Sequence, residues 1–109
     1  MTEFQNKVYE ALKLIPRGKV TTYKQLGDFI KCGSSQAVGQ ALKKNPFAPE
    51  VPCHRVIKSD LTIGGYIGER EGQLIEKKIS LLRNEGIQIS ADGKLLNSKQ
   101  LFKYKSTSV

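Results

Sequence analysis

The sequence is poor in the residues that build metal sites and disulfides. It has two cysteines and one histidine among 109 residues, and the cysteines lack the Cys-x-x-Cys spacing of a structural zinc site. Residues 1–10 carry no apolar run of the kind found in a signal peptide, and no stretch approaches the ~20 apolar residues of a membrane span. We therefore expect no metal, no cofactor and no membrane association, and a cytoplasmic protein with reduced thiols.

Acidic residues are scarce relative to basic ones. The chain has 10 aspartates and glutamates against 18 lysines and arginines, which gives a net charge of +8. This balance fits a polyanionic partner such as nucleic acid. A basic soluble protein without such a partner would have the same composition, so charge alone does not decide.

The length predicts one domain. A chain of 109 residues with 39% hydrophobic residues can bury one core but hardly two. Residues 98–109 contain lysines and no acids. We expect a monomer with a folded domain over residues 1–97 and a basic, flexible tail over 98–109.

Apolar residues at helical spacing predict a first helix that ends at Pro16. They are Phe4, Val8, Ala11, Leu12 and Ile15. Thr2 followed by Gln5 has the form of a capping box at its start. A turn over residues 16–19 and a short strand at Val20–Thr21 should follow.

Two short helices with a tight turn between them are predicted next. Thr22 should cap a helix that the Cys32-Gly33 pair ends, and Ser34 or Ser35 should cap another over residues 37–42. This order is typical of a helix-turn-helix. The second of these two helices has a pattern that an ordinary core helix with a cationic last turn would also give.

The second half predicts one long helix among short β elements. Residues 54–57 and 61–63 flank a turn and indicate a hairpin, which a glycine-rich stretch at 64–68 follows. Apolar spacing over 74–82 predicts the last helix, closed by Gly86, and residues 87–96 indicate a second small hairpin. The fold class is mainly α with small β hairpins.

The only histidine of the chain directly follows a cysteine. Cys53 is a useful nucleophile only as a thiolate, and His54 could take its proton if a turn or a bridging water brought the two together. Glu85 is the candidate for orienting His54, because a carboxylate at a helix C-terminus is placed against the helix dipole. Each residue taken alone also fits a structural role.

Five segments together resemble the O6-alkylguanine-DNA alkyltransferases. The string VPCHRVI at 51–57, with NP at 45–46 before it, resembles the active-site signature of that family. The segments GKVTTY at 18–23, AVG at 37–39, GGY at 64–66 and LLRNEG at 81–86 resemble family segments in the same order and spacing. The resemblance covers about residues 4–89.

This resemblance implies a winged helix-turn-helix domain that binds the minor groove of double-stranded DNA and rotates an alkylated guanine into a pocket. Cys53 would accept the alkyl group irreversibly, in a single turnover. His54 would act as its base through a water, Glu85 would hold His54, and Asn45 would support the loop before the cysteine.

The resemblance also implies residues that contact DNA and residues that line the pocket. The implied DNA-binding residues are Tyr23, Gln36, Ala37, Gly39, Lys43, Lys44 and Arg55. The implied pocket residues are Tyr23, Val51, Pro52, Tyr66, Ile67 and Gly68. Tyr23 would press on the phosphate of the rotated nucleotide.

The chain departs from the family pattern at two residues. Gln36 stands where the family has an arginine that fills the place of the extruded base, and Ile67 stands where it often has a serine. We also expect that the N-terminal domain common in the family is absent. These departures leave open an alternative, an alkyltransferase-like protein that binds the lesion without repairing it, and a third reading, a plain winged-helix DNA binder.

Overall fold

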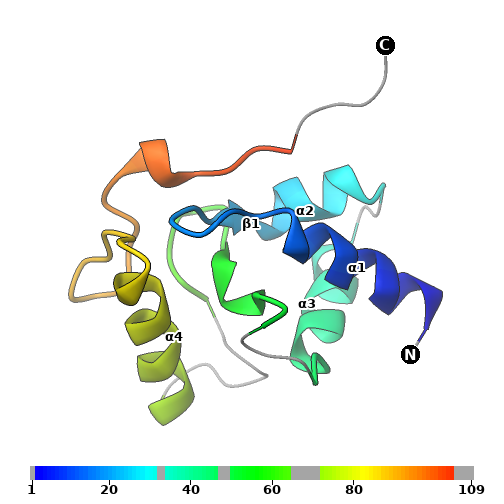
Figure 1. Cartoon of the computed structure of the whole chain (residues 1–109), viewed down its shortest axis with the longest axis horizontal. Coiled ribbons are helices and arrows are strands. Elements are labelled where there is room, and N and C mark those ends of the chain that lie inside the picture. Colours follow the sequence, from blue (N-terminus) through cyan, green and yellow to red (C-terminus); the bar gives the residue numbers. More distant parts are fainter. Residues whose placement is uncertain (1, 32–33, 47–49, 65–71, 105–109) are drawn as a thin grey trace.

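The computed structural model describes residues 2–31, 34–46, 50–64 and 72–104, without the side chains of Ser35 and Leu74. The elements, in chain order, are α1 (Glu3–Lys13), β1 (Thr21–Thr22), α2 (Tyr23–Phe29), α3 (Ser35–Lys43), the 3-10 helix η1 (Cys53–Arg55), β2 (Val56–Ile57), α4 (Gln73–Asn84) and the 3-10 helix η2 (Ser98–Gln100). Helices α1, α2 and α3 form one group, α4 stands apart from them, and the chain of η1 and β2 runs between (Figure 1). No described helix is long and apolar enough to cross a membrane.

Helix α1 has the predicted start. The Thr2 hydroxyl accepts a hydrogen bond from the Gln5 backbone at 3.0 Å, and the Gln5 side chain accepts one from the Thr2 backbone at 3.0 Å, which completes the capping box. Val8 and Leu12, one turn apart, are fully buried. Leu14 caps the helix at its other end, two residues before Pro16.

The predicted helix-turn-helix is confirmed as α2 and α3. The Thr22 hydroxyl accepts from the Gln25 backbone at 3.1 Å, and the Ser34 hydroxyl accepts from the Ala37 backbone at 3.1 Å, so each helix has the expected cap. Leu26 of α2 and Val38 of α3 are fully buried in a core shared with α1. This packing holds α3 with its polar side chains outward.

The strand β2 pairs differently from the sequence prediction. Val56 pairs with Thr21 in a parallel two-stranded sheet, and Ile57 pairs with Thr22. Residues 58–62 form a tight turn, in which the Lys58 amide donates to the Thr62 carbonyl at 2.9 Å, and Thr62 bridges Lys94 in antiparallel fashion. The parallel pairing attaches the chain after Cys53 directly to the start of α2.

The second predicted hairpin and the helix end before it are confirmed. Gly86 follows the α4 cap with φ +85°, the left-handed conformation that glycine favours. Ile89 then bridges Leu95 in antiparallel fashion, and the Leu96 amide donates to the Gln88 carbonyl at 2.9 Å. A second core beneath α4 joins this hairpin to the rest of the domain.

The chain after Ser98 stays on the domain as far as residue 104. The Val20 amide donates to the Gln100 carbonyl at 2.9 Å, and the Phe102 amide donates to the Val20 carbonyl at 2.6 Å. The Tyr104 ring stacks on Phe29 with centroids 4.3 Å apart, and its hydroxyl donates to the Ala11 carbonyl at 2.8 Å. Backbone hydrogen bonds to Val20 and the aromatic contacts of Tyr104 thus hold the first part of the predicted tail against the domain.

Truncation of Tyr104 should show how much this segment stabilises the domain. We expect Tyr104→Ala to lower the free energy of unfolding by about 2 kcal/mol, since it removes a stacked ring and a hydrogen bond to α1. Urea unfolding measures the change. The exposed neighbour variant Lys99→Ala should stay within about 0.5 kcal/mol of wild type, and equal stability of the two variants would contradict this account.

Candidate active site

Cys53 and His54 lie in a turn that the sequence alone left open. The η1 helix bends the chain after Pro52, and the Arg55 amide donates to the Pro52 carbonyl at 3.0 Å. Cys53 is 4% exposed and His54 is 2% exposed. Both side chains therefore sit inside the protein, between the helix-turn-helix core and α4.

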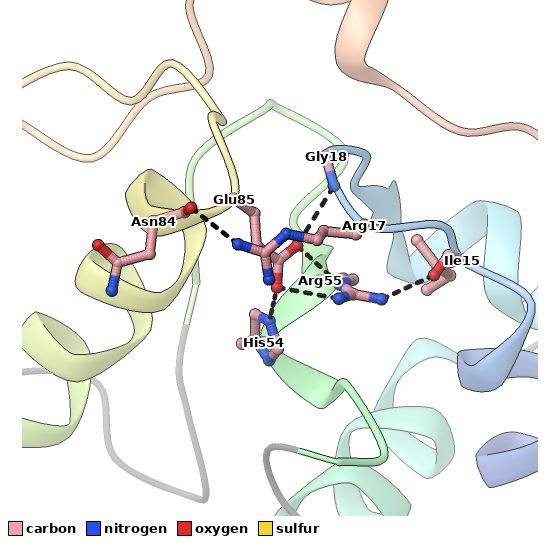
Figure 2. A network of polar contacts seen from close by, with 7 residues as sticks. All are labelled: Ile15, Arg17, Gly18, His54, Arg55, Asn84 and Glu85. Atoms are coloured by element: carbon pink, nitrogen blue, oxygen red, sulfur yellow. Dashed lines mark hydrogen bonds and ion pairs between the residues drawn. The ribbon is translucent and has the colours of Figure 1, made fainter.

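Glu85 contacts His54 from the end of α4. His54 Nε2 and Glu85 Oε2 are 2.7 Å apart (Figure 2). The same carboxylate accepts from Arg55 Nε at 2.8 Å, from Arg55 Nη2 at 3.0 Å and from the Gly18 amide at 3.4 Å. Burial would raise the pKa of the Glu85 carboxyl, but hydrogen bonds from Arg55 and His54 outweigh it and hold that pKa below its usual range.

An ionised Glu85 fixes the form of the imidazole. A carboxylate can only accept, so His54 Nε2 carries the proton that it donates, and the neutral ring has its lone pair on Nδ1. Nδ1 is buried and has no hydrogen-bond partner within the described part of the chain. Burial, with smaller effects from Arg55 and Lys78, lowers the pKa of His54 although Glu85 raises it. His54 is thus a neutral base with an acceptor atom that no described residue uses.

Asn45 supports the loop that leads to the cysteine. It is 6% exposed, and its Nδ2 donates to the Val51 carbonyl at 2.9 Å. Val51 and Pro52, which directly precede Cys53, are buried as well. The structure therefore brings together the four residues predicted to be catalytic, or to support catalysis, on η1, α4 and this loop.

Tyr23 approaches the site from the first turn of α2. A β-carbon built on Gly64 would lie 3.5 Å from the Tyr23 hydroxyl and 3.0 Å from Lys58 Cγ, so this glycine with φ +67° leaves room for both side chains. Burial, and then the neighbouring Cys53 thiolate, raise the pKa of Tyr23. The predicted pocket residues Tyr66, Ile67 and Gly68 lie outside the described residues.

The residues predicted to contact DNA divide into two groups. Gln36, Lys43 and Lys44 are exposed on or just after α3, and Gly39 has open space where a β-carbon would stand. Ala37 is half-buried on the same helix.

Arg55 differs from these residues, because its guanidinium makes contacts inside the protein. Its Nη1 donates to the Ile15 carbonyl at 2.8 Å, and its Nε and Nη2 donate to the Glu85 carboxylate. The structure gives Arg55 these internal contacts, and its contact with DNA stays a prediction.

Lys78 is a buried cation that the sequence analysis missed. It is 0% exposed, and its Nζ donates to the Val56 carbonyl at 2.8 Å and to the Ile63 carbonyl. Burial lowers its pKa to about 7, although the nearby Cys53 thiolate raises it. Lys78 thereby joins β2 to the turn before Gly64 and brings positive charge close to the cysteine.

Replacing Lys78 by methionine should change how stability depends on pH. The pKa of this lysine is about 7 in the folded protein and ~10.4 in an unfolded chain. Between these values the unfolded chain binds more protons, so wild-type stability should rise with pH by up to about 1.4 kcal/mol per unit.

Urea unfolding at pH 7 and pH 9 measures this effect in both proteins. Lys78→Met should lack most of the rise, whereas the exposed-residue control Lys77→Met should keep it. An equal rise in stability in Lys78→Met and wild type would contradict the lowered pKa of the buried Lys78.

No group of three or more histidine, cysteine, aspartate or glutamate side chains in the described ranges could hold a metal ion. The polar centre of the site is instead the network around one carboxylate, which Arg17 extends by donating to the Asn84 carbonyl at 3.1 Å (Figure 2). The chemistry that this network can support is proton transfer to and from a buried thiol.

Comparison with known proteins places this site in a family. The family model of the 6-O-methylguanine DNA methyltransferase, DNA binding domain, matches residues 3–87. A methylated-DNA--protein-cysteine methyltransferase of Thermococcus sibiricus is 44% identical over 88 residues, which cover 80% of this chain and 46% of that protein. This chain thus spans about half the length of such curated relatives.

Solved structures agree with the family model. The structure of Mycobacterium tuberculosis OGT in complex with DNA matches with a TM-score of 0.70 and 41% identity, over 78% of this chain and 50% of that one. S. pombe Atl1, in complex with damaged DNA containing O6-carboxymethylguanine, matches with a TM-score of 0.77 and 33% identity, over 95% of this chain and 98% of that one. The chain belongs to the family of the 6-O-methylguanine DNA methyltransferase DNA-binding domain.

Proposed function

We propose that this protein repairs DNA by moving an alkyl group from O6 of guanine in double-stranded DNA to Cys53. The observation that carries the proposal is the buried network in which Glu85 fixes His54, the residue that directly follows Cys53, and leaves Nδ1 without a hydrogen-bond partner among the described residues. The family membership supports it, since its relatives carry the name methylated-DNA--protein-cysteine methyltransferase.

The reaction is a direct displacement at the alkyl carbon. His54 Nδ1 takes the Cys53 proton through a bridging water, and the thiolate attacks the alkyl carbon. The carbon–oxygen bond breaks, its electron pair passes to O6, and the guanine takes up a proton. The product thioether has no good leaving group, so each protein molecule reacts once, and no cofactor is needed because the protein itself is the acceptor.

Burial of Cys53 requires the guanine to leave the DNA stack. The thiol is 4% exposed, so an alkyl carbon inside a duplex cannot reach it unless the nucleotide rotates into the protein. In this proposal Tyr23, whose hydroxyl lies near Gly64, presses on the phosphate of that nucleotide. Tyr66, Ile67 and Gly68 complete the proposed pocket.

Helix α3 is the proposed DNA-contacting element. Ala37 and Gly39 keep its face thin enough for the minor groove, Gln36 occupies the place of the rotated base, and Lys43 and Lys44 contact phosphates. The net charge of +8 makes this binding electrostatic and independent of sequence. We further propose that the protein acts as a monomer in the cytoplasm.

A titration of protein against a lesion-bearing duplex tests the proposal. DNA with one O6-methylguanine should lose the lesion until one equivalent per protein molecule is consumed, and then the reaction should stop. Tight binding with every lesion intact would overturn the proposal in favour of a lesion-binding protein. Preference for one undamaged sequence would overturn it in favour of a regulator.

A further inference from the structure

Arg55 is held in the interior by two other parts of the chain. Its Nη1 donates to the Ile15 carbonyl after α1, and its Nε and Nη2 donate to the Glu85 carboxylate at the end of α4. Its side chain is 16% exposed. A guanidinium engaged in this way has little left to offer a DNA phosphate.

The geometry at Glu85 needs an arginine. The planar guanidinium donates one hydrogen bond to each carboxylate oxygen, which fixes the plane of the carboxylate as well as its position. The same Oε2 accepts from His54 Nε2 at 2.7 Å, so the orientation of Glu85 sets the orientation of the imidazole (Figure 2). A lysine would supply the charge but only a point contact.

We infer that Arg55 is a positioning residue that clamps Glu85 against His54 and so keeps His54 aimed, as a neutral base, for the activation of Cys53. The effect on His54 stands on the contacts alone. The effect on alkyl transfer rests on the function proposed above.

The charges around His54 explain why the clamp also affects protonation. Cys53 and Arg55 flank it on its own segment, and Glu85 and Lys78 face it from α4. A carboxylate alone would favour the imidazolium form of a buried histidine, which cannot accept the thiol proton. Burial is the main cause that keeps the pKa of His54 below its usual range, and Arg55 adds to it by offsetting part of the effect of that carboxylate.

Nuclear magnetic resonance of the imidazole tests the inference without DNA. His54 is the only histidine of the chain, so its ring signals need no assignment. In Arg55→Met, loss of the cation should raise the pKa of His54 by about one unit. Arg55→Lys keeps the charge and should give a smaller rise. Arg17→Lys changes an arginine of the same network that donates to the Asn84 carbonyl and not to the Glu85 carboxylate, and it should leave the His54 titration unchanged.

Single-turnover alkyl transfer supplies the second measurement. In Arg55→Met the acidic limb of the pH–rate profile should move upward together with the His54 pKa, and in Arg55→Lys the rate constant should fall about tenfold because the carboxylate is no longer fixed. A folded Arg55→Met with the wild-type His54 pKa would overturn the inference. Should that variant not fold, Arg55→Lys with wild-type titration and rate would overturn it. If the wild type transfers no alkyl group, the His54 titrations still decide.

Discussion

Cys53→Ser is expected to abolish alkyl transfer while leaving the affinity for alkylated DNA within about twofold of wild type. The serine hydroxyl is far less acidic than the thiol, and a neutral His54 with a lowered pKa is too weak a base to ionise it. The change is nearly isosteric, so the core around this buried position should keep its packing. Loss of O6-methylguanine from a duplex measures transfer, and fluorescence anisotropy of the same duplex measures binding.

Cys32→Ser is the matched control for this variant. It changes the only other cysteine of the sequence, and it should transfer the alkyl group at the wild-type rate. Transfer that survives in Cys53→Ser and disappears in Cys32→Ser would identify Cys32 as the acceptor and contradict the role given to Cys53.

Glu85→Gln should lower the transfer rate constant by about 100-fold and the free energy of unfolding by about 3 kcal/mol. The amide cannot accept from both His54 and the Arg55 fork, so it leaves a guanidinium that is 16% exposed without its counterion. The imidazole also loses the acceptor that keeps Nδ1 unprotonated. Single-turnover kinetics and urea unfolding at pH 7 measure the two effects.

The acid side of the stability profile separates Glu85 from other carboxylates. Its folded-state pKa is depressed, so its contribution is present above the unfolded value of ~4.3 and is lost as pH falls through the folded value. Glu85→Gln should therefore show a smaller loss of stability in acid than wild type. Glu76→Gln, on the exposed face of α4, should behave as wild type in rate and stability. Equal effects of the two variants would contradict the role given to Glu85.

The parts of the fold that depend on local chemistry could be predicted from the sequence. Side-chain caps at Thr2, Thr22 and Ser34, and the left-handed Gly86, each act within a few residues. The pairing of β1 with β2 joins residues that are far apart in the chain, and two-residue strands carry no alternation that would reveal their partner. The docking of residues 98–104 depends on aromatic contacts with α1 and α2, which charge composition does not reveal.

The site shows the same division between local pattern and three-dimensional contact. Cys53, His54 and Glu85 were predicted as a set because thiol activation needs a base and an orienting carboxylate. For Arg55 the resemblance implied only a contact with DNA, and its contact with Glu85 was not predicted because only the folded chain brings the two residues together. The burial of Lys78 was missed, although the sequence carries a signal for it. Lys78 lies three residues after Ile75 and four before Leu82, so it falls on the apolar stripe of α4.

Mass spectrometry of the protein after reaction with DNA carrying O6-methylguanine tests the central claim most directly. Under reducing conditions the intact protein should gain one methyl group in place of one hydrogen, and peptide analysis should locate it on Cys53. The Cys53→Ser variant should gain nothing. An unmodified wild-type protein that nevertheless binds the lesion, or a methyl group on any other residue, would contradict the account.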